Sequence, residues 1–165
     1  MKHHIVRFVF LATLSLSVAG AAAAKDYGVC SNAALEGAWG YTETGTVMVP
    51  SADGTVPVVA VAVGRYDFDL AGNFSGTQYS SAGGAVVSDA KLGTYALNPD
   101  CTGTLTIKIY DPSGTTLRRT SVWAIVVDDN AKEMRGIMTS MVLPNGVALS
   151  PIMAVSAKKL FPGSH

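Results

Sequence analysis

The side chains that could carry chemistry in this chain are carboxylates, tyrosines, lysines and arginines, because its body lacks histidine. The sequence contains three histidines, His3, His4 and His165, and none lies between Lys25 and Gly163. A histidine general base, a Ser-His-Asp triad and a histidine-rich zinc site are therefore excluded from that stretch. We expect no metal and no cofactor, and a catalyst built here would have to use carboxylates, Tyr, Lys or Arg.

Glu43 is the one carboxylate that stands out as a catalytic candidate. Trp39, Tyr41 and Glu43 alternate along the chain, so in a β-strand they share one face. If that face lines an interior, burial would raise the pKa of the carboxyl group and make it a plausible acid or base. If the face points outward, Glu43 is a solvated rim residue. We favour the rim, because the following Thr44-Gly45 is expected near the end of a strand.

The basic residues are predicted to be solvated. Arg65 and Asp67 are two positions apart and share a strand face, which predicts a surface ion pair. The pairs Arg118-Arg119 and Lys158-Lys159 are too small to indicate a membrane or nucleic-acid surface. Arg135 is likewise expected to make a surface ion pair.

Two cysteines, Cys30 and Cys101, are the only ones in the chain. In an oxidising compartment they are expected to form one intramolecular disulfide, with two free thiols as the alternative. Closing so long a loop would stabilise the fold by about 4 kcal/mol. The bridge would tie the segment before the first strand to the turn that contains Asn98-Pro99-Asp100.

The first residues have the pattern of a secretory signal peptide. Lys2 and Arg7 precede an apolar run that ends in Ala21-Ala22-Ala23-Ala24, and polar residues resume at Lys25. We expect cleavage near Ala24, which leaves residues 25–165 as one domain, secreted or periplasmic, without a membrane span. The remaining chain has two more acidic than basic residues, so nothing attracts nucleic acid.

The rest of the chain predicts an all-β fold. Runs rich in Val, Ile, Thr, Tyr and Trp are separated by Gly, Pro, Asn and Asp, and a single turn of helix is expected near 31–36. Because every connection is short, neighbouring strands should pair antiparallel, as an up-and-down barrel or, alternatively, a sandwich. We favour the barrel. The eight expected strands are 38–49, 58–69, 73–80, 85–97, 103–110, 115–128, 132–143 and 147–157.

The second expected strand is apolar on both faces in its first half. One face carries Val59, Val61 and Val63, and the other carries small residues such as Ala60 and Gly64. An antiparallel strand with one wet face should alternate. The valine face is therefore expected to be covered, by a terminal segment of the chain or by a second copy in a homo-oligomer.

Small residues on the inner face leave space in an eight-stranded barrel, which either large side chains or a ligand can fill. The residues that we expect to line such a lumen and contact a small apolar molecule are Trp39, Tyr41, Tyr66, Trp123 and Met138. The alternative is that these residues form an ordinary core.

The first half of the chain expected to remain after cleavage contains five short motifs: Val63-Gly64-Arg65, Phe68-Asp69, the run at 72–77, Gly93-Thr94-Tyr95 and the run at 98–105. With these motifs the chain resembles a set of uncharacterised exported bacterial proteins. The strand order is also similar to allene oxide cyclase-like and lipocalin-like barrels. That similarity implies an eight-stranded, calycin-like barrel that binds apolar small molecules, and the cyclase group implies possible enzymes. Gly37-Ala38-Trp39 has the lipocalin Gly-x-Trp spacing without the rest of that pattern.

Three functions remain open. The first is binding of a small apolar molecule in the lumen. The second is a cyclase or isomerase in which one carboxylate or tyrosine assists a confined substrate. The third is a structural or interaction protein of the cell envelope, which the doubly apolar second strand would suit.

Overall fold

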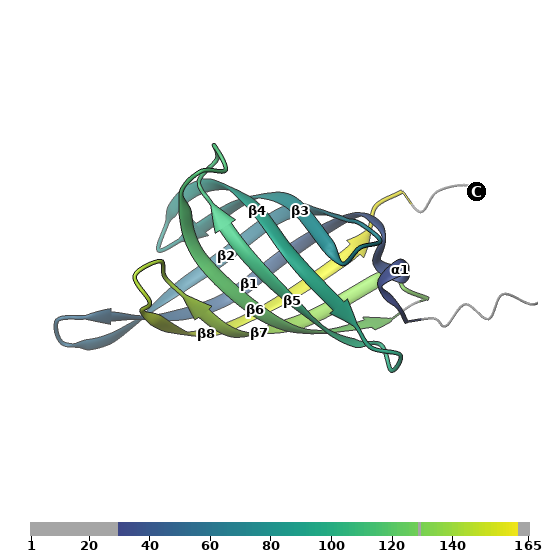
Figure 1. The fold of residues 1–165 in the computed structure, drawn as a ribbon. Helices are drawn as coiled ribbons and strands as arrows, with labels where there is room; N and C mark the ends of the chain where they lie inside the picture. The colour runs from purple at the N-terminus through teal and green to yellow at the C-terminus, as the bar shows by residue number, and fades with distance from the viewer. Residues whose placement is uncertain (1–29, 129, 162–165) are drawn as a thin grey trace, which may run out of the picture.

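The chain folds into a closed barrel of eight antiparallel strands in sequence order (Figure 1). A computed structural model describes residues 30–128 and 130–161, so the expected leader at 1–24 lies outside the described residues. The barrel was predicted, and its closure through pairing of β1 with β8 excludes the sandwich. The elements are α1 (Asn32–Leu35), β1 (Gly37–Ser51), β2 (Gly54–Phe68), β3 (Asn73–Ala82), β4 (Ala85–Leu97), β5 (Thr102–Tyr110), β6 (Leu117–Asp128), β7 (Glu133–Val142) and β8 (Ala148–Lys159).

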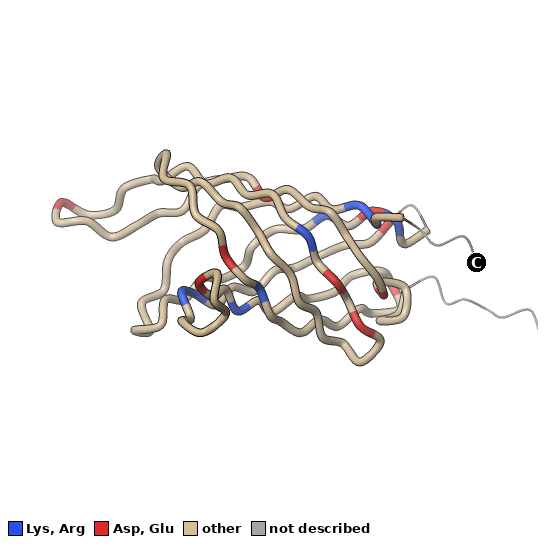
Figure 2. Tube along the Cα trace, turned by 90° about the horizontal axis from the view of Figure 1, so that it is seen from above, with Lys and Arg blue, Asp and Glu red and all other residues tan. Residues whose placement is uncertain are grey.

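The hairpin of β1 and β2 is longer than expected. The pairing continues from the barrel to Ser51 and Gly54, so the expected loop at 50–57 is mostly strand. Beyond the point where β2 stops pairing with β3, at Ala60, the hairpin projects from the barrel (Figure 1). Its tip carries one acidic residue and the projecting part carries no basic residue (Figure 2).

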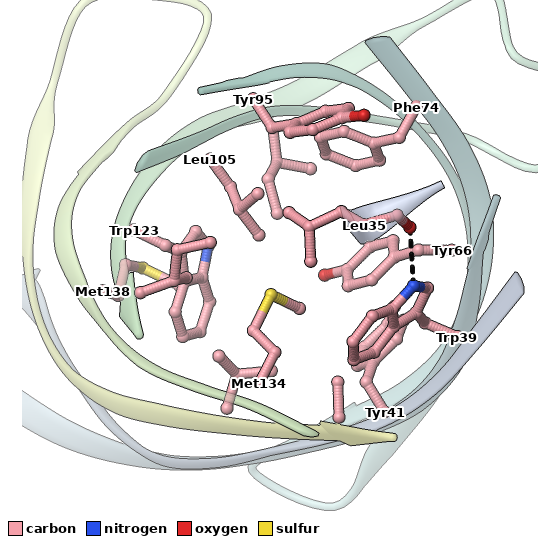
Figure 3. Close-up of a cluster of buried hydrophobic side chains, with 14 of the residues drawn as sticks. Leu35, Trp39, Tyr41, Tyr66, Phe74, Tyr95, Leu105, Trp123, Met134 and Met138 are labelled. Atoms are coloured by element: carbon pink, nitrogen blue, oxygen red, sulfur yellow. Dashed lines mark hydrogen bonds between the residues drawn. The ribbon is translucent and has the colours of Figure 1, made fainter. Parts of the chain in front are cut away.

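One end of the barrel is plugged by α1, and we call it the plugged end. Leu35 is fully buried inside the barrel, and the Trp39 indole Nε1 donates a hydrogen bond to its carbonyl oxygen at 2.8 Å (Figure 3). Asn32 fixes the helix to β4, because its side-chain oxygen accepts from the Leu97 backbone N–H at 2.9 Å and its carbonyl accepts from Tyr95. The predicted helical turn is confirmed.

The predicted disulfide between Cys30 and Cys101 is confirmed. It joins Cys30, two positions before α1 begins, to the turn between β4 and β5, with the two Cα atoms 4.9 Å apart. The bridge therefore holds the helix at the plugged end, where the turns β2–β3, β4–β5 and β6–β7 also lie. The other four turns lie at the opposite end, which we call the far end.

Side chains alternate between the lumen and the outer wall, as the period of two in a strand requires. At the plugged end the lumen holds an aromatic cluster in which Phe68 contacts four rings, those of Trp39, Tyr66, Phe74 and Tyr95. The valine face of β2 lies on the outer wall and is exposed, with Val59 at 66%. No described residue covers it, so the expected covering partner stays a prediction.

Candidate functional site

The lumen has a second region, toward the far end, in which ionisable side chains are buried. Glu43 comes from β1 and Lys91 from β4, and they form an ion pair of 2.7 Å with side chains 6% and 0% exposed. Our expectation of a rim position for Glu43 was wrong. Its strand continues well past Gly45, which is a point of close approach to β8, where an added Cβ would lie 2.0 Å from the Ile152 carbonyl oxygen.

Two tyrosines complete the environment of this ion pair. The Tyr66 hydroxyl donates to Glu43 Oε1 at 3.1 Å, and Lys91 Nζ donates to the same hydroxyl oxygen at 3.2 Å. Lys91 Nζ also lies 4.5 Å from the centre of the Tyr41 ring, which is stacked on Tyr66. The cation is therefore held by one carboxylate, one hydroxyl and one aromatic face.

Burial is the main cause of the pKa shifts of Lys91 and of the two tyrosines. It lowers the pKa of the Lys91 ammonium, and the neighbouring Glu43 carboxylate opposes that shift. It raises the pKa of the Tyr66 hydroxyl, with the charge of Glu43 acting in the same direction. The pKa of Tyr41 is also raised, by burial and then by Glu43. Both phenols are therefore neutral hydrogen-bond donors at ordinary pH.

A second carboxylate, Asp89 on β4, links the ion pair to the far end. Its Oδ2 accepts from Gln78 Nε2 at 2.7 Å, and Gln78 Oε1 accepts from the Tyr41 hydroxyl at 3.4 Å. Its Oδ1 accepts from Arg118 Nη1 at 2.7 Å. Arg119 lies 3.7 Å from Oδ2. The prediction that both arginines are merely solvated was wrong, since their side chains are only 36% and 24% exposed.

The network reaches solvent between β3 and β6. Val87 faces the lumen beyond Asp89 on the same strand face and is 39% exposed. On β1, β7 and β8, toward the same end, Val47, Met141 and Met153 are less than a tenth exposed and belong to the hydrophobic core. The far end is therefore more exposed beside Val87 and the two arginines than beside the buried methionines.

Gly64 shows how the sequence makes room for this network. It faces the lumen opposite Tyr41 and Gln78, and a Cβ there would lie 2.5 Å from the Tyr41 hydroxyl. The space that small residues were expected to leave on β2 is therefore taken, at this position, by the Tyr41 side chain.

All five residues expected to line the lumen do face it (Figure 3). Trp39 belongs to the plugged end, whereas Tyr41 and Tyr66 belong to the charged network. Trp123 Nε1 donates to Ser121 at 3.1 Å, and Met138 pairs with Trp123 across β6 and β7. Whether a ligand touches these residues stays a prediction. The sequence reading missed Gln78, Asp89, Lys91 and Arg119.

Two further hollows lie on the outer wall, one on each side of β1. The larger, of about 560 Å³, runs over β6, β7, β8 and β1 and is lined by outward residues such as Ala124, Ile137 and Ala154. The smaller, of about 340 Å³, runs over β1 to β4 beside Val61 and Tyr79. Both are shallow and mostly apolar.

Within residues 30–128 and 130–161, no group of three or more His, Cys, Asp or Glu side chains could hold a metal ion. In the same residues no helix has the length and apolar character needed to cross a membrane.

Comparison with known proteins finds similarity to a solved structure. No family model matches this chain. No curated protein matches it either. A solved structure that is similar to it is described as a redesigned β-barrel, mFAP1, bound to DFHBI. The TM-score is 0.48 and the identity is 13%, over 78% of this chain and 97% of that one.

Proposed function

We propose that the protein binds a small, mostly apolar molecule inside the barrel, which enters at the far end between β3 and β6. The observation that carries this proposal is the buried network around Glu43 and Lys91, set in an apolar interior and continued to solvent by Asp89 and the two arginines. A largely apolar site with a few convergent polar groups is typical of small-molecule binding. Apolar side chains of similar volume in place of a buried ion pair often leave stability unchanged or raise it, so stability alone does not account for this pair.

Methionines supply the adaptability that such a site needs. Met134, Met138, Met141 and Met153 all face the lumen and are less than a tenth exposed. Unbranched thioether side chains repack at low cost, so they can move aside when a ligand enters. Trp39, Tyr41, Tyr66, Trp123 and Met138 remain the residues proposed to surround it.

The proposal is tested by blocking the entrance. Nile red, a neutral dye, is titrated into the full chain and its emission is followed. Val87→Trp should abolish the emission increase, because it places an indole in the entrance. Val86→Trp is the matched control, since Val86 is the neighbouring residue but points outward and is 71% exposed. Equal binding by both variants, or no dye binding by the unaltered protein, would contradict the proposal.

A cyclase or isomerase activity is the second candidate, because Glu43 is buried beside Tyr66 and Lys91. Such a reaction conserves the mass of its substrate. Molecules that co-purify with the exported protein are therefore compared, after incubation with fresh protein, for a changed chromatographic position at constant mass. Glu43→Gln should abolish the change while Nile red still binds. A change that persists in Glu43→Gln would exclude this carboxylate from the reaction.

We also propose that the protein is exported and that two copies of it associate. The disulfide supports an oxidising compartment such as the periplasm or the cell exterior. The exposed faces of Val59, Val61 and Val63 support contact with a second copy. Sedimentation over a range of concentrations should show a dimer that Val61→Asp dissociates, and a strictly monomeric protein would contradict self-association.

A further inference from the structure

We infer that the molecule bound in the lumen carries an anionic head, such as a carboxylate, and that Arg119 binds this head at the far end. The inference rests on the proposed lumen site and names the chemical class of its ligand. The apolar body of the molecule would lie deeper in the lumen, among the methionines and Trp123.

The charges of the network do not balance among the described residues. It contains two carboxylates, Glu43 and Asp89, and three cations, Lys91, Arg118 and Arg119. Glu43 is matched by Lys91 and Asp89 by Arg118, each at 2.7 Å. One positive charge is left over, and it belongs to Arg119.

Arg119 also has hydrogen-bonding capacity that the described residues leave unused. Its only polar contact among residues 30–128 and 130–161 is the 3.7 Å approach to Asp89, which is beyond hydrogen-bond distance. A guanidinium presents five N–H donors in a fixed fork that suits a carboxylate or phosphate. The side chain is 24% exposed, so it is mostly withdrawn from water and yet reachable from the entrance.

Register places this arginine in the lumen wall two strands away from Lys91. Lys91 pairs with Ile109 across β4 and β5, and Ile109 pairs with Arg119 across β5 and β6. Paired residues project from the same face of a sheet, and Ile109 is buried in the lumen. Two cations therefore flank one apolar side chain in a single row, and an anion bound in front of Ile109 would face both of them.

The other acidic groups near the far end do not supply the missing charge. Asp111 in the β5–β6 turn accepts hydrogen bonds from its own turn, from Ser113, Thr115 and Thr116. Asp53 lies at the tip of the projecting hairpin. Within residues 30–128 and 130–161 the row of cations thus lacks an acidic partner, and an anion bound from solution would supply it.

The test compares three probes that share one apolar chain, namely dodecanoate, dodecan-1-ol and dodecylammonium. Each displaces Nile red from the full chain in 0.15 M salt. Dodecanoate should displace the dye at a concentration at least about tenfold lower than dodecanol, as expected for one charge-assisted hydrogen-bonded pair, and dodecylammonium should be weaker still.

Arg119→Ala should abolish the preference for dodecanoate and leave dodecanol unchanged. Arg119→Lys should keep part of it, and circular dichroism checks that both variants fold. Lys108→Ala is the matched control, because it removes a positive charge from the outer wall of the adjacent strand. Equal displacement by dodecanoate and dodecanol, or a preference that survives Arg119→Ala, overturns the anionic head but leaves lumen binding intact. Failure of Nile red itself to bind overturns the proposed function, and the inference with it.

Discussion

The two halves of this barrel differ in whether the lumen or the outer wall carries their charged side chains. In the plugged half the lumen is aromatic and the outer wall carries charges. Toward the far end, the lumen of β1 and β4 carries charges, and the outer wall of β2 carries exposed valines. The outer charged residues that form ion pairs toward the plugged end include Arg65, Asp67, Asp128, Glu133, Arg135 and Lys158.

The plugged half shows what stability alone requires. Neutral polar groups here find nearby partners, as Trp39 does with Leu35 and Asn32 with Leu97. Burying such groups costs little once they are hydrogen-bonded. Burying ions costs several kcal/mol for each even when they are paired. The far half contains a buried ion pair despite that cost, and we therefore place the proposed binding site there.

The same comparison applies to two ion pairs, one inside the lumen and one on the outer wall. Lys91–Glu43 and Arg65–Asp67 have the same N–O distance of 2.7 Å, but the first is buried and the side chains of the second are 55% and 49% exposed. Distance is therefore not a measure of what an ion pair does. Figure 2 shows that charged positions are sparse along the trace, so each pair can be altered separately.

The largest effect is expected from breaking the buried pair. Lys91→Met leaves Glu43 as an uncompensated buried charge and should lower the free energy of unfolding by about 3 to 5 kcal/mol. Adding Glu43→Gln should recover most of that loss, since no buried charge is then left. Urea unfolding of the two single variants and the double variant measures both effects. A Lys91→Met loss below about 1 kcal/mol would show that water reaches the pair.

Removing the disulfide should weaken the plugged half. Replacing both Cys30 and Cys101 with serine is expected to cost about 2 to 5 kcal/mol, because the reduced unfolded chain gains freedom. Nile red binding at low temperature should survive, since the bridge lies at the opposite end from the entrance. Thermal unfolding and dye titration measure the two effects. Two reactive thiols in unfolded, unreduced protein from its own host would show that the bridge does not form.

Alkaline pH should act on the plugged half through Tyr95. Burial raises its pKa from 10.0 to about 12. The folded state therefore holds the phenol proton more tightly than the unfolded state does. The stability this contributes is complete below pH 10 and is lost as the pH rises toward 12. Tyr95→Phe should show a shallower decline in urea unfolding over that interval. An unchanged slope would mean that the hydroxyl titrates alike in both states.

The sequence predicts the plugged half of this molecule better than the far half. Alternating residues and turn residues were enough to predict the barrel and the helical turn, because these depend on local geometry, and the presence of two cysteines in a chain expected to be exported predicted the bridge. The network was not predictable by the rule that charged residues face water. In β4 the residues Asp89 and Lys91 face inward while Leu92 is 49% exposed, the reverse of that rule. Only the register with β5, which places Lys91 opposite the buried Ile109, reveals it.

The smallest effect is expected from the exposed pair. The Arg65 guanidinium makes two short contacts with Asp67, at 2.7 Å from Nη2 and 3.1 Å from Nε, in a well-formed geometry. Both groups remain accessible to water and salt, so Arg65→Ala should change the free energy of unfolding by less than about 1 kcal/mol. The change should shrink further in 1 M NaCl, where exposed charges are screened. Urea unfolding at low and high salt measures it. A loss as large as that of Lys91→Met would mean that the outer wall here is covered, as a dimer interface over the neighbouring Val63 would cover it.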